Sequence, residues 1–174
     1  MRFIKHKLLA RRAKAMASRL QVPRHTINYK EAKRIGILFQ TTKQQSTEWF
    51  QNLKDRFKKD GKEVDLLGFV PKAPQNGLEE DFFTSKDISI SGKIASDKVK
   101  EFVNKEFDYL YCISEENSAV FDSILAESKA KCRVGRYNQR KDMLYEMMIH
   151  IKPEDSYNTL VDEMLKYTKA IAYN

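Results

Sequence analysis

Hydroxyl and amide side chains lie in the turns after the predicted strands, where open α/β sheets bind their ligands. These turns supply a candidate cleft for a small molecule or nucleotide, formed by Thr41, Thr42, Ser46, Ser114, Asn117 and Arg136. The turn over residues 41–46 opens a predicted helix, as a phosphate-binding loop does. It contains no glycine, and without glycine the backbone closes around a phosphate with difficulty. A helix cap, with Thr42 and Gln45 as a capping box, explains the same residues.

Groups suited to catalysis or metal binding are few, and the three histidines are His6, His25 and His150. Two fall in a basic N-terminal segment and one in a predicted strand, so no histidine pairs with a nucleophile or a second ligand. Cys112 and Cys132 lie on neighbouring predicted strands and fit buried packing residues better than a redox pair. Glu115 and Glu116 follow a strand end, but adjacent carboxylates in a turn are typically solvated. We therefore expect no metal, no cofactor and no catalytic residue, although an enzyme is left open.

The basic charge of the chain is concentrated at its start. The net charge is +8 over 174 residues, but residues 1–34 alone carry eleven basic residues against one acidic residue, and the remainder is slightly acidic. Such a segregated block is typical of an interaction arm. Its candidate RNA-binding residues are Lys5, Lys7, Arg11, Arg12, Lys14, Arg19 and Arg24.

The arm is predicted to be an amphipathic helix over residues 2–20, ended by Pro23. Its apolar stripe consists of Leu9, Ala13, Met16 and Leu20. At 100° per residue, Lys7, Arg11 and Lys14 fall opposite this stripe. One flank carries Lys5, Arg12 and Arg19.

Four interpretations of this helix remain open. It could dock on its own domain with its charges merely solvated, or bind the phosphates of RNA. It could also lie on an anionic membrane surface, or be a mitochondrial targeting peptide. We favour RNA, because closely spaced Lys and Arg displace counterions from phosphates.

Composition limits the remaining classes. A hydrophobic content of 41% supports one core of ordinary size, and no apolar run approaches the roughly 18 residues that span a bilayer. The run Leu8–Ala10 is too short for a secretory signal. Two cysteines give no disulfide framework, which favours reduced thiols and a cytoplasmic location.

Short apolar runs alternate with helical patterns after Lys33, as in βαβ chains with a parallel sheet. The five predicted strands cover residues 35–39, 64–70, 107–113, 133–135 and 145–151. We expect a three-layer Rossmann-like or flavodoxin-like domain at 33–174, preceded by a helical arm and linker at 1–32. Because sheets covered on both faces have continuous apolar strands, Ile37 and Cys112 should be buried on adjacent central strands.

One connection departs from this alternation. Residues 71–96 form a long crossover with a short strand candidate at 82–84, and such connections are often functional or wander over the surface. Outside this connection, one helix is expected to begin after the turn at 41–46 and another after the turn at 114–117. A last helix is expected through Leu160 and Ile171.

Two resemblances accompany this pattern. The segments Phe107–Ser114 and Ala130–Gly135 resemble a strand and a following Arg-Ile-Gly-type strand of the N-terminal domain of heptosyltransferase-like glycosyltransferases. Those enzymes use a second domain for the nucleotide sugar, so this resemblance implies the fold rather than the activity.

The second resemblance covers nearly the whole chain. The basic first helix, the Ile35–Leu38 strand, the Lys86-Asp87-Ile88 and Gly92-Lys93 stretch and the closing helix are similar to an uncharacterised family of short Bacteroidota proteins. This resemblance implies no activity. From the strongly basic arm beside a nearly neutral body, we expect a non-enzymatic protein whose arm engages structured RNA, such as that of a ribosomal particle.

Overall fold

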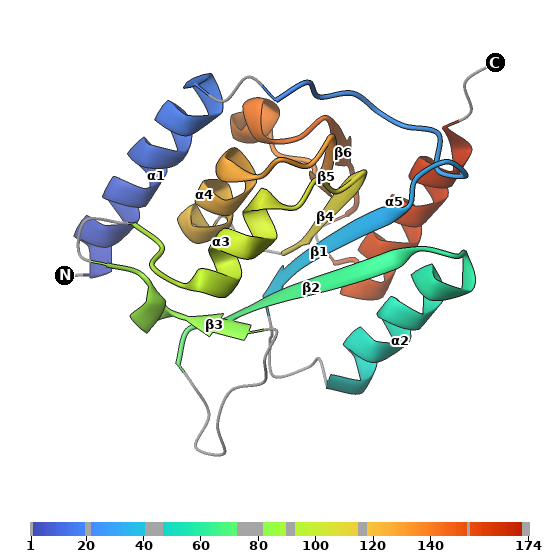
Figure 1. Ribbon diagram of the computed structural model, residues 1–174, viewed down its shortest axis with the longest axis horizontal. Helices are drawn as coiled ribbons and strands as arrows, with labels where there is room; N and C mark the ends of the chain where they lie inside the picture. The colour runs from blue at the N-terminus through green and yellow to red at the C-terminus, as the bar shows by residue number, and fades with distance from the viewer. Residues whose placement is uncertain are drawn as a thin grey trace.

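Six parallel strands form a single sheet in the order β3-β2-β1-β4-β5-β6 (Figure 1). The structure is a computed structural model, and it describes residues 2–19, 22–40, 47–72, 82–89, 93–114, 118–152 and 154–171. The strands are β1 (Arg34–Gln40), β2 (Glu63–Val70), β3 (Phe82–Thr84), β4 (Tyr109–Ile113), β5 (Cys132–Arg136) and β6 (Met147–Ile149). This is the Rossmann order, not the flavodoxin order, and its direction reverses between β1 and β4.

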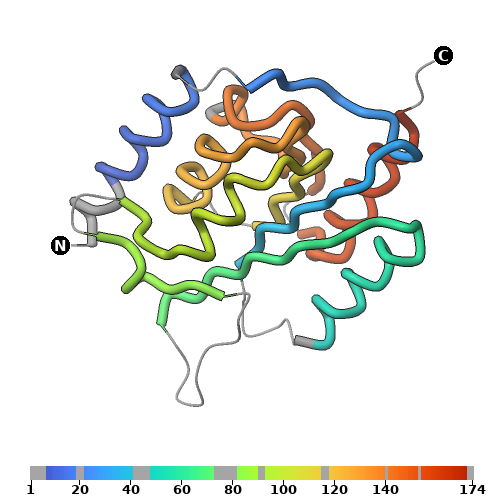
Figure 2. Tube along the Cα trace, viewed as in Figure 1, coloured from blue at the N-terminus to red at the C-terminus, as the bar shows by residue number. Residues whose placement is uncertain are grey.

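Helices cover both faces of the sheet (Figures 1 and 2). The elements are α1 (Arg2–Arg19), α2 (Thr47–Lys59), α3 (Asp97–Asn104), α4 (Ala119–Glu127), α5 (Tyr157–Ala170) and the 3-10 helices η1 (Ser85–Asp87) and η2 (Gln139–Leu144). Residues of α3 and α4 share one core cluster with α1, and residues of α2 and α5 share the other. The predicted three-layer α/β class with a parallel sheet is therefore confirmed.

The sheet has six strands, so the prediction of five was wrong. The additional strand is β3, whose three residues pair with the end of β2 through Gly68↔Phe82, Phe69↔Phe83 and Val70↔Thr84. The short strand candidate at 82–84 is thereby confirmed, although three residues are too few to establish an alternating pattern in the sequence. Their pairing with β2 makes them a strand.

Three other elements, α3, β6 and β4, also differ from the predictions. Helix α3 was not predicted, although Ser96 precedes it and its Val99, Phe102 and Val103 are buried. Strand β6 is shorter than residues 145–151 and covers only Met147–Ile149; before it, the ring of Tyr145 covers Gly135, and the amide of Glu146 donates to the carbonyl of Arg133 at 3.0 Å. Strand β4 begins at Tyr109, and the preceding Asp108 accepts hydrogen bonds from the amides of Lys33 and Arg34.

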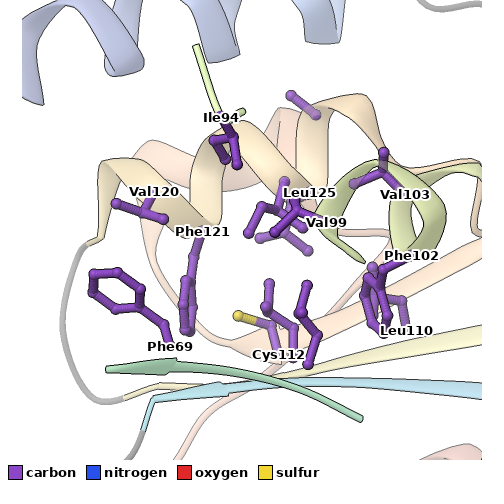
Figure 3. Close-up of a cluster of buried hydrophobic side chains, with 14 of the residues drawn as sticks. Phe69, Ile94, Val99, Phe102, Val103, Leu110, Cys112, Val120, Phe121 and Leu125 are labelled. Carbon is purple, nitrogen blue, oxygen red and sulfur yellow. The ribbon is translucent and has the colours of Figure 1, made fainter. Parts of the chain in front are cut away.

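The two core clusters lie on opposite faces of the central strands. Leu38 pairs with Cys112 across β1 and β4, and both lie in the cluster under α3 and α4, which Figure 3 shows around Cys112 and Phe121. Ile37 belongs to the other cluster. Since successive side chains of a strand alternate between faces, these continuous apolar runs serve two cores. The prediction that Ile37 and Cys112 are buried on adjacent strands is confirmed.

The N-terminal segment is built into both cores. Leu9 and Ala13 of α1 belong to the first cluster, and Tyr29 and Ala32 of the following segment belong to the second. That segment crosses the amino-terminal edge of the sheet, where the amide of His25 donates to the carbonyl of Lys131 at 3.0 Å (Figure 1). No helix within the described ranges is long and apolar enough to cross a membrane.

Candidate functional site

The inner face of α1 packs on α4. Leu9 is 1% exposed and Ala13 is 3% exposed. The large apolar side chains of α4 point toward the sheet, as Figure 3 shows for Phe121 and Leu125. Ser123 and Ala126 lie on the opposite side of α4 by helical geometry and are fully buried, since α1 packs there. This surface of small side chains lets the two helices approach closely.

The outer face of α1 presents an unpaired basic row, which consists of Lys7, Arg11 and Lys14. All three are exposed, and their side chains form no hydrogen bond or ion pair with the described part of the chain. Within residues 7–18, the other exposed positions are Ala10, Ala15 and Ser18. This face therefore holds only cations and small residues.

The spacing of the basic row follows from the helix. A rise of about 1.5 Å per residue puts Lys7 and Lys14 about 10 Å apart along the axis, with Arg11 between them. Residues at i, i+4 and i+7 lie on one side, so the three cations repel one another by about 0.2–0.5 kcal/mol per pair. Among the residues whose side chains are described, no carboxylate forms an ion pair with these three cations; the carboxylate beside α1, Glu127, pairs with Arg12.

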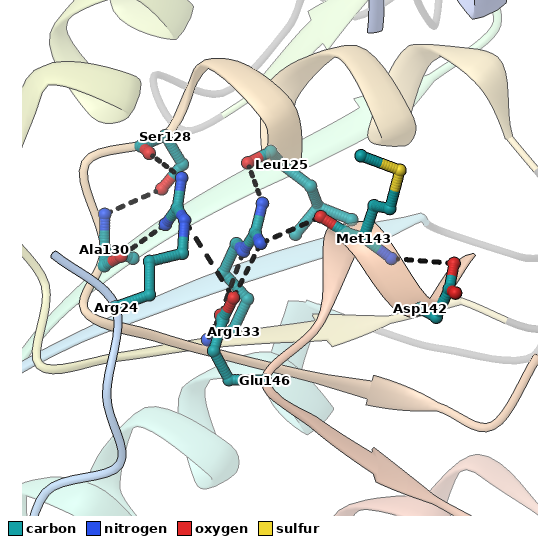
Figure 4. A network of polar contacts seen from close by, with 8 residues as sticks. All are labelled: Arg24, Leu125, Ser128, Ala130, Arg133, Asp142, Met143 and Glu146. Carbon is teal, nitrogen blue, oxygen red and sulfur yellow. Dashed lines mark hydrogen bonds and ion pairs between the residues drawn. The ribbon is translucent and has the colours of Figure 1, made fainter. Parts of the chain in front are cut away.

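Two of the predicted RNA-binding residues are used within the fold. Arg12 donates from Nε to Oε1 of Glu127 at 3.0 Å, which ties the flank of α1 to the end of α4. Arg24 donates from Nη1 to the carbonyl of Ala130 and, at 2.8 Å, from Nη2 to the carbonyl of Ser128 (Figure 4). The structure thus separates them from the basic row.

Arg24 lies beside a second buried guanidinium. Burial and the neighbouring Arg133 lower the pKa of Arg24 to about 10, while Glu146 acts in the opposite direction. Arg133 is 3% exposed and donates to Glu146 through Nε at 3.0 Å and Nη2 at 2.7 Å. It also donates to the carbonyls of Leu125 and Met143 (Figure 4). This network joins the linker, α4, β5 and η2, and the sequence patterns did not indicate it.

Several predicted site residues cannot be placed by the structure. Those outside the described residues are Thr41, Thr42, Ser46 and Asn117, together with the side chains of Lys5 and Arg19. The capping box of Thr42 with Gln45 lies outside them too. The structure does place the basic row and two residues of the candidate cleft, Ser114 and Arg136.

Ser114 and Arg136, the two described residues of the candidate cleft, lie at the carboxyl edge of the sheet. Ser114 follows β4 and Arg136 ends β5, and the pairing of Cys112 with Gly135 puts both strand ends at one level. Arg136 donates from Nη2 to the carbonyl of Lys152 at 3.3 Å. Nearby Ser118 precedes α4 without capping it through its side chain. The reversal of strand order between β1 and β4 falls beside Ser114.

The two thiols are buried and held in their protonated form. Burial raises the pKa of Cys112 to about 11 and that of Cys132 to about 12. Cys132 pairs with Tyr109, three residues before Cys112 on the adjacent strand, so the thiols are about 10 Å apart along the strand direction. That separation is too long for a disulfide. Within the described ranges, no group of three or more His, Cys, Asp or Glu residues could hold a metal ion.

Comparison with known proteins gives one match. A model of a family of unknown function (DUF6913) matches residues 5–171. It confirms the resemblance of nearly the whole chain to an uncharacterised family. No curated protein and no solved structure matches the chain.

Proposed function

The chain belongs to DUF6913, a family of unknown function, and from its geometry we propose that it is a non-enzymatic protein that binds structured RNA through the outer face of α1. RNA of a ribosomal particle is the partner we favour. The basic row of Lys7, Arg11 and Lys14 supplies the contacts to phosphate.

The observation that carries this proposal is that the basic row has no partner within the described fold. Arg12 and Arg24 show that this protein can pair cations with its own acceptors. The three cations of the row instead face outward at mutually repulsive spacing. A bound polyanion would relieve that repulsion and release counterions, which favours association at low salt.

The outer face supports RNA over a membrane surface as the partner. An interfacial helix buries large apolar side chains among lipids while its cations remain near the headgroups. In α1 the apolar stripe is used against α4, with Leu9 almost fully buried. The other exposed positions within residues 7–18 are Ala10, Ala15 and Ser18, which offer almost no apolar area to a bilayer.

Docking on α4 also favours a binding role, because it holds the row in one geometry. The ion pair of Arg12 with Glu127 and the burial of Leu9 fix the rotation of α1 about its axis. The cations are therefore presented without the ordering cost that an unfolded arm would incur on binding. A folded helix with one free face suits a phosphate surface.

The proposal is tested with a fluorescent hairpin RNA and a variant carrying Lys7→Gln, Arg11→Gln and Lys14→Gln. The triple variant should bind several-fold more weakly, and the salt dependence should flatten by roughly 0.7 to 0.9 units of slope per lost contact. The matched control removes three charges from α2 on the opposite face, with Lys54→Gln, Lys58→Gln and Lys59→Gln. Anionic vesicles at the same ionic strength form the comparison for a membrane partner.

Equal RNA affinity of the wild type and the triple variant would contradict the proposal. So would an equal loss in the α2 control, because net charge alone would then explain the binding. Preferential binding to vesicles, weakened by Leu8→Ser, would favour the membrane alternative.

A second candidate function is an enzyme or binding protein for a small anionic molecule or nucleotide at the carboxyl edge of β1 and β4. The Rossmann strand order supports it, because such sheets bind ligands where the order reverses. Ser114 and Arg136 are the described residues at that edge. A bound nucleotide released by denaturing the purified protein, with loss of the nucleotide in Arg136→Gln, would support this alternative. The local resemblance to glycosyltransferases contributes no substrate to it.

A further inference from the structure

The outer face of α1 has, among its described side chains, no aromatic ring on which a base could stack. Within residues 7–18 the exposed positions carry only ammonium, guanidinium, methyl and hydroxyl groups. The exposed large apolar side chains of the described chain are Tyr137, Met143 and Tyr167, and none lies on α1. Proteins that bind single strands depend on aromatic platforms for stacking. The outer face of α1 has none among its described side chains.

The docking of α1 also limits how deeply it could enter a nucleic acid. Its inner face is covered by α4, and Leu9 and Ala13 on that face are buried. The major groove of an RNA double helix is deep and narrow, and side chains cannot read bases there. With only one side of α1 free, the row is placed to lie along the phosphate backbone.

We propose that the outer face of α1 recognises the phosphate backbone of a double helix, independently of base sequence. This inference rests on the proposed function and narrows its ligand from structured RNA to the duplex parts of it. Single strands, loops and base edges are not the target.

The spacing of the cations in the basic row agrees with the spacing of phosphates along one strand of a duplex. One strand of a duplex presents a phosphate about every 3.4 Å along its axis, so a row about 10 Å long faces about three phosphates. The small side chains of Ala10, between Lys7 and Arg11, and of Ala15, next to Lys14, leave room for the sugar-phosphate chain to approach the row. A duplex holds its phosphates in a fixed ridge, whereas a flexible single strand would have to be ordered without the gain of stacking.

The experiment measures binding of the full-length protein to four probes at matched ionic strength. These are a short RNA duplex, a second RNA duplex of shuffled sequence, one of the separated strands made unable to fold, and a DNA duplex of the first sequence. We expect several-fold tighter binding to both RNA duplexes than to the single strand. The two duplex sequences should differ by less than about twofold, because phosphate contacts position a protein without specifying bases.

Variants then assign the contact to the row. Lys7→Gln, Arg11→Gln and Lys14→Gln, made singly, should each lower the slope of log K against log salt by about 0.9 on the duplex. The α2 control with Lys54→Gln, Lys58→Gln and Lys59→Gln should leave the duplex affinity unchanged. Tighter binding of the RNA duplex than of the DNA duplex would show that the A-form geometry is recognised. Equal binding of the two would show that the backbone is recognised in either form. Both outcomes support the inference.

Failure of the inference differs from failure of the proposed function. Equal or tighter binding of the single strand, lost in the triple variant, would overturn the duplex inference while supporting RNA binding by α1. A strong preference for one duplex sequence would also overturn it. Absence of binding to all four probes would overturn both.

Discussion

Glu146 holds the buried Arg133 with both carboxylate oxygens: Oε1 accepts from Nη2 at 2.7 Å and Oε2 from Nε at 3.0 Å. The same Oε1 lies 3.9 Å from Nε of Arg24. Two guanidinium groups thus depend on one carboxylate, and one of them anchors the segment that follows α1.

Replacing Glu146 with Gln should therefore destabilise the protein strongly. The substitution leaves Arg133 buried without its countercharge, and removing one partner of a buried pair costs about 3–5 kcal/mol. Urea unfolding followed by circular dichroism measures the change in free energy. Asp162→Asn is the control, because the ion pair of Asp162 with Arg56 is about half exposed and should contribute less than about 1 kcal/mol. Similar losses in the two variants would contradict the assignment.

Asp108 should make the stability of the protein sensitive to acid. Burial raises the pKa of Asp108, but the ammonium of Lys131 and the amides of Arg34 and Lys33 lower it more, so its pKa lies below the ordinary value of 3.8. A carboxyl whose folded pKa is depressed stabilises the fold above its unfolded pKa, and this stability is lost as the pH falls through the folded value. The Asp108→Asn variant should therefore be less stable at neutral pH and lose less of its stability below about pH 4. Unfolding midpoints measured across that range test it, and parallel acid curves for both proteins would contradict it.

Gly135 should not tolerate a side chain. A Cβ at this position would fall on the ring of Tyr145, which covers β5. Gly135→Ala is therefore expected to cost about 1–3 kcal/mol through overpacking. Combined with Tyr145→Leu, the cost should be smaller than the sum of the two single changes, since the clash is then absent. An additive double-mutant cycle would show that the two residues do not interact.

The basic row should be a source of instability in the free protein. Replacing Lys7, Arg11 and Lys14 with Gln removes two repulsive neighbouring pairs, which should raise the free energy of unfolding by about 0.4–1 kcal/mol at low salt. The gain should shrink at high salt because these exposed charges are screened. Thermal unfolding at two ionic strengths measures both effects. A stability loss in this variant would mean that the row has a structural role, and would weaken the RNA proposal.

The patterns in the sequence determined the elements that depend on near neighbours. The apolar runs of β1 and β4 placed Ile37 and Cys112 on adjacent buried strands, because period and burial are local properties of a strand. The helical period likewise placed Leu9 on one side of α1 and Lys7 on the other, and the structure has Leu9 buried and Lys7 exposed.

The tertiary structure decided everything that depends on which distant residues meet. The helical period set Lys7, Arg11 and Lys14 apart from Arg12 on the flank, but it named no partner for any basic candidate. In the structure Arg24 reaches carbonyls more than a hundred positions away and Arg12 reaches Glu127, while the basic row faces outward. The three residues of β3 became a strand only by pairing with the end of β2. The physical reason is that a hydrogen bond or ion pair forms with whichever group chain folding brings within about 3 Å, and local periodicity carries no information about that group.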